Sequence, residues 1–100
     1  MIAPEFEWNV RKAEENLKKH GVSFKEALTV FADPLANIFD DPDHSDRERR
    51  ELIIGHSSTQ RLVIVSFTER GQRTRIIGAR LATPRERREY EQKSDKNSTT

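Results

Sequence analysis

The stretch LVIVSFTERGQRTRIIGARL, residues 62–81, decides the fold that the sequence predicts. Two runs of mostly apolar residues are separated by Arg70-Gly71, a short connection that is typical of an antiparallel hairpin. The first run, residues 62–67, is apolar on both faces for most of its length and therefore indicates a central strand. Together with the segments before it, this predicts strands at 35–39, 52–58, 62–68 and 73–81.

Two helices are predicted before the sheet. Asn9 is a good N-cap for a helix that ends near Lys19, in a basic last turn. Ser23 and Glu26 form a capping box for a second helix, which Asp33-Pro34 stops. The pair is a helix–turn–helix in the loose sense, but the second helix uses its large residues for the core, which argues against DNA recognition.

A third helix is expected from Thr83 to about Gln92, and residues 93–100 have the composition of a disordered tail. The prediction is one domain, residues 1–92, of the α+β class. In this fold two N-terminal helices pack on a four-stranded, mainly antiparallel sheet, and the C-terminal helix follows. A chain of 100 residues suits one such domain.

The composition limits the function classes. With no cysteine and three separated histidines, neither a disulfide scaffold nor a metal site is expected, and no cofactor is predicted. No apolar run reaches the length of a membrane span, and the start lacks the pattern of a signal peptide. The expected location is therefore the cytoplasm, with no membrane contact.

The near-balance of charge conceals an asymmetry. The chain has 18 basic and 17 acidic side chains. Residues 1–60 hold 8 basic and 12 acidic side chains, whereas residues 61–100 hold 10 basic and 5 acidic ones, most of the basic ones arginine. Arginine suits bidentate contact with phosphate, so the second half is a candidate surface for nucleic acid, with a solvated surface of ion pairs as the alternative.

Two-residue loops in both hairpins would place the arginines on one face of the sheet. Thr68 would lie opposite Arg73, and Ser66 opposite Arg75, with Glu51 and Ile53 on the same side. The opposite face would form the core under the N-terminal helices. Its expected residues are Leu52, Ile54, Val63, Val65, Phe67 and Ile76.

An arginine cluster on an uncovered face suits a phosphodiester backbone. Without a metal, a ribose 2′-hydroxyl can attack its own phosphate if a base takes the proton and cations stabilise the dianion. Arg73 and Arg75 are candidates for the cations, and Glu69 or His44 for proton transfer. The simpler alternatives are that the arginines pair with Glu51 and Glu69, and that His44 stabilises an Asp-rich loop.

The chain resembles the BrnT toxins of bacterial type II toxin–antitoxin systems over roughly residues 5–92. The resemblance is carried by the segments FEWNVRKAEENLKKHGVSFKEALTVFADP, DPDHSDRERRELIIGHSS and FTERGQRTRIIGARLATPRERREYE. It implies a RelE-like fold and a ribonuclease that inhibits translation. It also implies a ribbon-helix-helix antitoxin, BrnA-like, in a hetero-oligomer that contacts operator DNA only through the antitoxin.

The resemblance implies roles by position. Arg75 and Arg80 would stabilise the transition state, and Glu69 would act as the acid–base group. Gly78 stands where the family's segment is expected to have serine, and Glu51 where an apolar or aromatic residue is more frequent, so Glu51 is not assigned to the site. The residues expected to bind RNA are Arg70, Arg73, Arg85 and Arg88.

Three function classes are weighed. The favoured one is a metal-independent endoribonuclease toxin. The second is a nucleic-acid-binding or operator-binding component without catalysis. The third is an interaction module whose last helix, with Tyr90 as its single large apolar residue, holds a partner protein.

Overall fold

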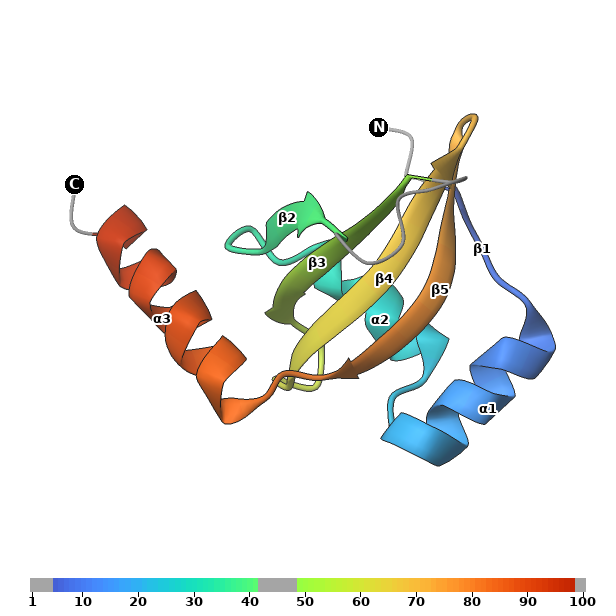
Figure 1. The fold of residues 1–100 in the computed structure, drawn as a ribbon, viewed down its shortest axis with the longest axis horizontal. Coiled ribbons are helices and arrows are strands. Elements are labelled where there is room, and N and C mark those ends of the chain that lie inside the picture. The colour runs from blue at the N-terminus through green and yellow to red at the C-terminus, as the bar shows by residue number, and fades with distance from the viewer. Residues whose placement is uncertain (1–4, 42–48, 99–100) are drawn as a thin grey trace.

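The computed structural model describes residues 5–41 and 49–98 and shows an α+β fold with a five-stranded mixed sheet (Figure 1). Among the described residues, no helix is both long enough and apolar enough to cross a membrane. The elements in chain order are β1 (Glu5–Glu7), α1 (Val10–His20), α2 (Phe24–Val30), β2 (Asn37–Asp40), β3 (Arg50–His56), β4 (Leu62–Arg70), β5 (Arg73–Leu81) and α3 (Pro84–Ser98).

The strands lie in the order β1-β5-β4-β3-β2. The predicted antiparallel arrangement of β2, β3, β4 and β5 is confirmed. Strand β4 pairs on both sides and is central, as its two apolar faces predict.

The prediction of four strands is wrong, because β1 adds a fifth. It runs parallel to β5, with Glu5 opposite Arg73 and Glu7 opposite Arg75. Three residues are too few to show the alternation that identifies a strand. Moreover, the partner of β1 lies 68 positions further along the chain, so nothing local in the sequence indicates the pairing.

Strand β5 contains one residue that β4 does not match. Phe67 lies opposite Ile76, but Ser66 lies opposite Gly78, so Ile77 is the extra residue of a β-bulge. Neither the expected loop lengths nor the apolar pattern predicted this insertion.

The bulge decides which arginines share a face. Arg75 and Arg80 are five positions apart, so regular alternation would place them on opposite faces. In the structure Arg75 lies opposite Thr68 and Arg80 opposite Ile64, two β4 residues that share a face. The expected pairing of Thr68 with Arg73 is therefore wrong in register, although all three arginines of β5 lie on the same side as Thr68.

The facing predicted for β3 is wrong. The connection to β4 spans five residues, 57–61, instead of two. Because the difference is an odd number of residues, each side chain of β3 lies on the face opposite to the predicted one. Ile53 lies opposite Val65 and belongs to the core with α2, whereas Leu52 and Ile54 lie on the other face.

Glu26 of α2 holds this connection in place. Its carboxylate accepts hydrogen bonds from Arg61 (2.9 Å from Nε), the Thr59 hydroxyl (2.6 Å) and the Ser57 hydroxyl (2.7 Å). These bonds, that of Arg61 above all, outweigh partial burial and lower the pKa of Glu26 to about 2. The backbone N–H of Glu26 donates to Ser23 Oγ, the predicted N-cap bond.

The main core lies between α2 and the sheet. Phe31 joins it to β1 and β4, with its ring centroid 5.1 Å from that of Phe6 and 5.0 Å from that of Phe67. The buried residues of this core are Val22, Phe24, Ala27, Val30, Ile53, Val63, Val65, Phe67, Ile76 and Ala79.

Helix α1 closes the edge of β5 beyond β1. The Asn16 carboxamide accepts from the Ala79 N–H (3.1 Å) and donates to the Ala79 carbonyl (2.8 Å) and the Val22 carbonyl (2.9 Å). One side chain thus satisfies the donor and the acceptor that Ala79 would present to a neighbouring strand. The helix starts at the predicted N-cap, Asn9, which accepts from the Lys12 N–H.

Helix α3 is anchored by Tyr90 on the face of the sheet opposite to α2. Tyr90 is 4% exposed and packs with Ile54, Leu62 and Ile64, while its hydroxyl donates to Asp33 (3.1 Å). Burial acts to raise the pKa of Asp33, but hydrogen bonds, first among them one from the His56 N–H, lower it. This carboxylate therefore joins the end of α2, β3 and α3.

The start of α3 is the predicted capping box, in which Thr83 and Glu86 bond each other's backbone N–H. The helix continues to Ser98, past the end expected near Gln92.

Loss of the Arg61 guanidinium should weaken the fold in a pH-dependent manner. The pKa of Glu26 is depressed in the folded state, so its stabilisation is present above the ordinary value of 4.5 and is lost as pH falls toward about 2. We expect Arg61→Ala to lower the free energy of unfolding at pH 7 and to flatten its fall with acid, because the guanidinium that does most to lower the pKa of Glu26 is lost. Urea unfolding at pH 7 and below pH 4 measures both. Arg11→Ala, at an exposed site, is the control, and an unchanged acid dependence in Arg61→Ala would contradict the assignment.

Candidate nucleic-acid interface

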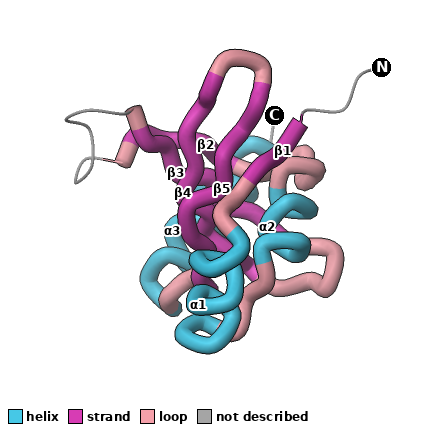
Figure 2. Tube along the Cα trace, turned by 90° about the vertical axis from the view of Figure 1, so that its right-hand side faces the viewer, coloured by secondary structure: helices cyan, strands magenta, loops and turns pink. Residues whose placement is uncertain are grey.

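The face of the sheet opposite to α2 carries the candidate interface. In Figure 1 this face is turned toward the viewer, with α2 behind it, α1 on one flank and α3 on the other. The turned view in Figure 2 shows α2 and α3 on opposite sides of the sheet, with α1 at the β5 edge. We call it the uncovered face, because α2 packs on the other side and α3 covers the part around Ile54, Leu62 and Ile64 through Tyr90.

Four arginines meet at one end of the uncovered face and are called here the hairpin arginines. Arg50 of β3 and Arg75 of β5 lie opposite the same β4 residue, Thr68. Next to this row, at the turn, Arg70 of β4 lies opposite Arg73 of β5. Because alternate residues of paired strands share a face, all four belong to the same side.

The two carboxylates of β1 neutralise part of this cluster. Arg73 Nε lies 3.1 Å from Glu5, and Arg75 Nη1 lies 2.6 Å from Glu7. The sequence-based alternative to a catalytic role, in which these arginines pair with Glu51 and Glu69, is right that they have carboxylate partners but wrong about which ones. Glu51 lies opposite Phe67, on the α2 side, and so it faces away from the arginines.

A groove lies at the other end of the uncovered face, around Arg80. We call it the Arg80 groove. Leu52, Ile64, Ser66 and Gly78 line it from the sheet, and Asn16 and His20 line it from α1. A Cβ at Gly78 would lie 3.7 Å from Asn16 Oδ1, an ordinary contact, so the serine expected there would fit.

Arg80 is held in a fixed orientation by Glu86 of α3. Nη1 and Nη2 donate to the two carboxylate oxygens at 2.8 and 3.0 Å, a bidentate pair. These bonds lower the pKa of Glu86 to about 2 and raise that of Arg80. Nη1 also contacts the Leu81 carbonyl (3.4 Å), which leaves Nε–H and one Nη2 hydrogen of this five-donor group for an anion.

The structure separates the residues predicted to act together in catalysis. Arg75 and Arg80 share a face, but the β4 residues opposite them, Thr68 and Ile64, are four positions apart, which is roughly 13 Å along the strand. Glu69 lies on the other face, two positions from the core residue Phe67, and accepts from the Thr74 hydroxyl at 3.3 Å. The structure therefore does not bring Glu69 to Arg80. His44 lies outside the described residues.

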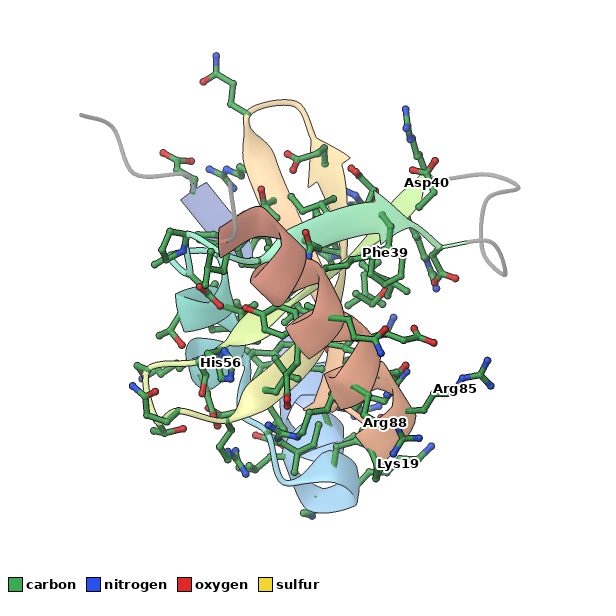
Figure 3. All side chains as sticks on the ribbon, turned by 90° about the vertical axis from the view of Figure 1, so that its left-hand side faces the viewer. Lys19, Phe39, Asp40, His56, Arg85 and Arg88 are labelled. Carbon is green, nitrogen blue, oxygen red and sulfur yellow. The ribbon has the colours of Figure 1, made fainter. Side chains whose placement is uncertain are left out.

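The predicted RNA-binding residues of α3 are exposed. Arg85 lies 3.4 Å from Glu89 in the same helix. Figure 3 shows Arg85 and Arg88 projecting to the same side as Lys19 of α1. The two helices that flank the uncovered face thus both carry cations on that side.

Two polar residues of the groove were missed by sequence reasoning, Asn16 and His20. They are four positions apart in α1 and therefore lie on one side of the helix. That spacing is visible in the sequence, but nothing local indicates that this side of the helix meets the edge of β5. Within residues 5–41 and 49–98, no cluster of three or more His, Cys, Asp or Glu side chains could hold a metal ion.

Fold and site together define a small α+β protein with a cationic sheet face between two helices, an arrangement that fits a polyanion. The family model described as ribonuclease toxin, BrnT, of type II toxin-antitoxin system matches residues 8–86. The chain therefore belongs to the BrnT family of ribonuclease toxins, as the sequence resemblance predicted, and a toxin of this type implies an antitoxin partner.

A solved structure supports the fold. The crystal structure of the Brucella abortus ribonuclease toxin BrnT matches with a TM-score of 0.63 at 21% sequence identity, over 81% of this chain and 99% of that chain. No curated protein sequence matches the chain significantly.

Removal of the β1 carboxylates should strengthen the binding of a polyanion. In the double variant Glu5→Gln and Glu7→Gln, the arginines Arg73 and Arg75 lose their ion pairs and become available to phosphate. We expect RNA affinity to rise about 3- to 10-fold and its dependence on salt to become steeper, because more counterions are released. Fluorescence anisotropy with a labelled RNA at several salt concentrations measures both.

The matched control is the double variant Glu14→Gln and Glu15→Gln, which makes the same change of charge on the exposed side of α1. Equal effects of the two double variants would mean that net charge, and not the hairpin arginines, governs binding.

Proposed function

We propose that the chain is a metal-independent endoribonuclease that cleaves RNA by attack of the ribose 2′-hydroxyl on its own phosphate, and that it thereby inhibits translation. The observation that carries the proposal is the uncovered face, on which arginines from β3, β4 and β5 share one side with the Arg80 groove. Membership of a family of ribonuclease toxins supports the reaction class.

The positions of the arginines support a division of roles. Arg80 is in the groove with two free donors, and we assign it the stabilisation of charge on the phosphorane, the five-coordinate intermediate. The hairpin arginines lie farther along the same face, where they would bind the RNA backbone on one side of the cleaved bond. Arg85 and Arg88 of α3 would extend this contact on the flank.

The antitoxin is, in our proposal, a ribbon-helix-helix protein of the BrnA type that forms a hetero-oligomer with the toxin. Operator DNA would be contacted only through that partner. Both proposals rest on the family, and so does a cytoplasmic location, where the RNA substrate is found. Helix α3, which is anchored to the sheet by Tyr90, is a candidate binding site for the antitoxin.

Neutralisation of Arg80 tests the ribonuclease directly. We expect Arg80→Gln to cleave RNA about 10²–10³-fold more slowly than wild type in EDTA, because a preorganised cation is lost from the transition state. Gel analysis of a labelled RNA measures the rate, and the products should carry a 2′,3′-cyclic phosphate. Arg11→Gln, on the exposed part of α1, should cleave normally. Intact RNA beside an active ribonuclease, together with harmless expression in a bacterium, would contradict the proposal.

A second variant tests whether the end of the uncovered face that carries the hairpin arginines acts on RNA or serves only to bind the antitoxin. We expect Arg75→Gln to reduce toxicity but to retain antitoxin binding in a co-purification assay. Loss of antitoxin binding with full toxicity would mean that this end of the face belongs to the partner instead of to RNA.

A further inference from the structure

We propose that His20 is the general acid of the reaction and protonates the 5′ oxygen that leaves the phosphorus. This inference rests on the proposed ribonuclease function and deepens it, because it assigns a proton donor to the Arg80 groove.

The position of His20 follows from the way α1 is fastened. The Asn16 carboxamide makes two hydrogen bonds to Ala79 and one to Val22, which fixes the last turns of the helix against the edge of β5. His20 is one turn further on the same side of α1. It is exposed and lines the groove together with Ser66 and Arg80.

The chemistry requires a group of this kind. A departing 5′ alkoxide is strongly basic, so cleavage is fast only if a proton reaches that oxygen as its bond to phosphorus breaks. Arg80 cannot supply the proton, because a guanidinium does not release one in a protein. The Ser66 hydroxyl is also a poor proton donor. Among the described residues that line the groove, His20 carries the imidazole, the type of side chain that most often serves as a general acid.

Other titratable groups are placed less well. Glu86 is occupied by its two bonds from Arg80, and Glu69 lies on the α2 side of the sheet. The ring of His56 packs against Tyr90, with centroids 5.4 Å apart, and Nδ1 lies 3.8 Å from Asp33, outside the Arg80 groove.

The step balances with these groups alone. The 2′ oxygen bonds to phosphorus and its proton passes to water, while Arg80 stabilises the charge on the non-bridging oxygens. The bond between phosphorus and the 5′ oxygen then breaks, and the His20 imidazolium donates its proton to that oxygen. The products are a 2′,3′-cyclic phosphate and a free 5′-hydroxyl, and the neutral imidazole takes up a proton from solvent.

A substrate with a sulfur atom in place of the leaving 5′ oxygen tests the assignment. A thiolate leaves without protonation, so its departure does not need a general acid. We expect His20→Gln to cleave ordinary RNA about 10²–10⁴-fold more slowly than wild type, and the 5′-thio substrate at nearly the wild-type rate. Arg80→Gln should be slow on both substrates, because the charge on the phosphorane is the same.

The control is Lys18→Gln, which changes an exposed residue of the same last turn that does not line the groove. Thermal unfolding of each variant verifies the fold. Normal cleavage of ordinary RNA by His20→Gln would overturn the inference, and so would an equal loss on both substrates, which indicates a positioning effect. Absence of cleavage by the wild type on either substrate would instead overturn the proposed function.

Discussion

One extra residue in β5 determines the character of the uncovered face. Because Ile77 is bulged, Arg80 emerges on the same side as Arg73 and Arg75, and Ala79 turns into the core beside α2. Without the bulge, a strand that buries Ile76 would direct Arg80 toward the core side and leave the groove without its cation. The bulge also places Gly78 opposite Ser66, where the floor of the groove carries little side-chain bulk. Packing of the core and composition of the site are therefore two results of the same backbone irregularity.

The two flanking helices depend on different kinds of attachment. Helix α1 is fastened by the polar contacts of Asn16 to the edge of β5, and helix α3 by the buried ring of Tyr90 and by Glu86. Both attachments end beside Arg80. Glu86 of α3 orients the guanidinium of this arginine, and Asn16 of α1 bonds the backbone of the neighbouring Ala79.

The local parts of the structure could be predicted from the sequence. The N-caps at Asn9 and Ser23 and the capping box at Thr83 depend on bonds across three positions, so residue types within one turn identify them. The central position of β4 follows equally from its own apolar residues. Features that depend on contacts between distant parts of the chain could not be predicted from local residue types. The pairing of β1 depends on a strand far along the chain, and the facing of β3 depends on the contact of Glu26 with residues 57–61.

The charge asymmetry of the sequence also has a structural explanation. Part of the acidic excess in the first 60 residues lies in β1, where Glu5 and Glu7 are counterions for arginines of the second half. The prediction that these arginines share a face agrees with the register, but their partners could be found only by knowing that β1 is a strand. The same reason explains why the sequence does not indicate the position of His20: its place in the Arg80 groove depends on the bonds of Asn16 to β5.

The parallel pairing of β1 with β5 has a consequence for the order of folding. The strands β3, β4 and β5 are joined by short connections, so their contacts close small loops at little cost in chain entropy. Strand β1 closes a loop of 68 residues and can dock only after β5 has left the ribosome, although it is synthesised first. Until that event, Arg73 and Arg75 carry their charge without Glu5 and Glu7. The toxin is thus more cationic on its uncovered face before β1 docks than afterwards, and the docking of this edge strand is the event that reduces the charge.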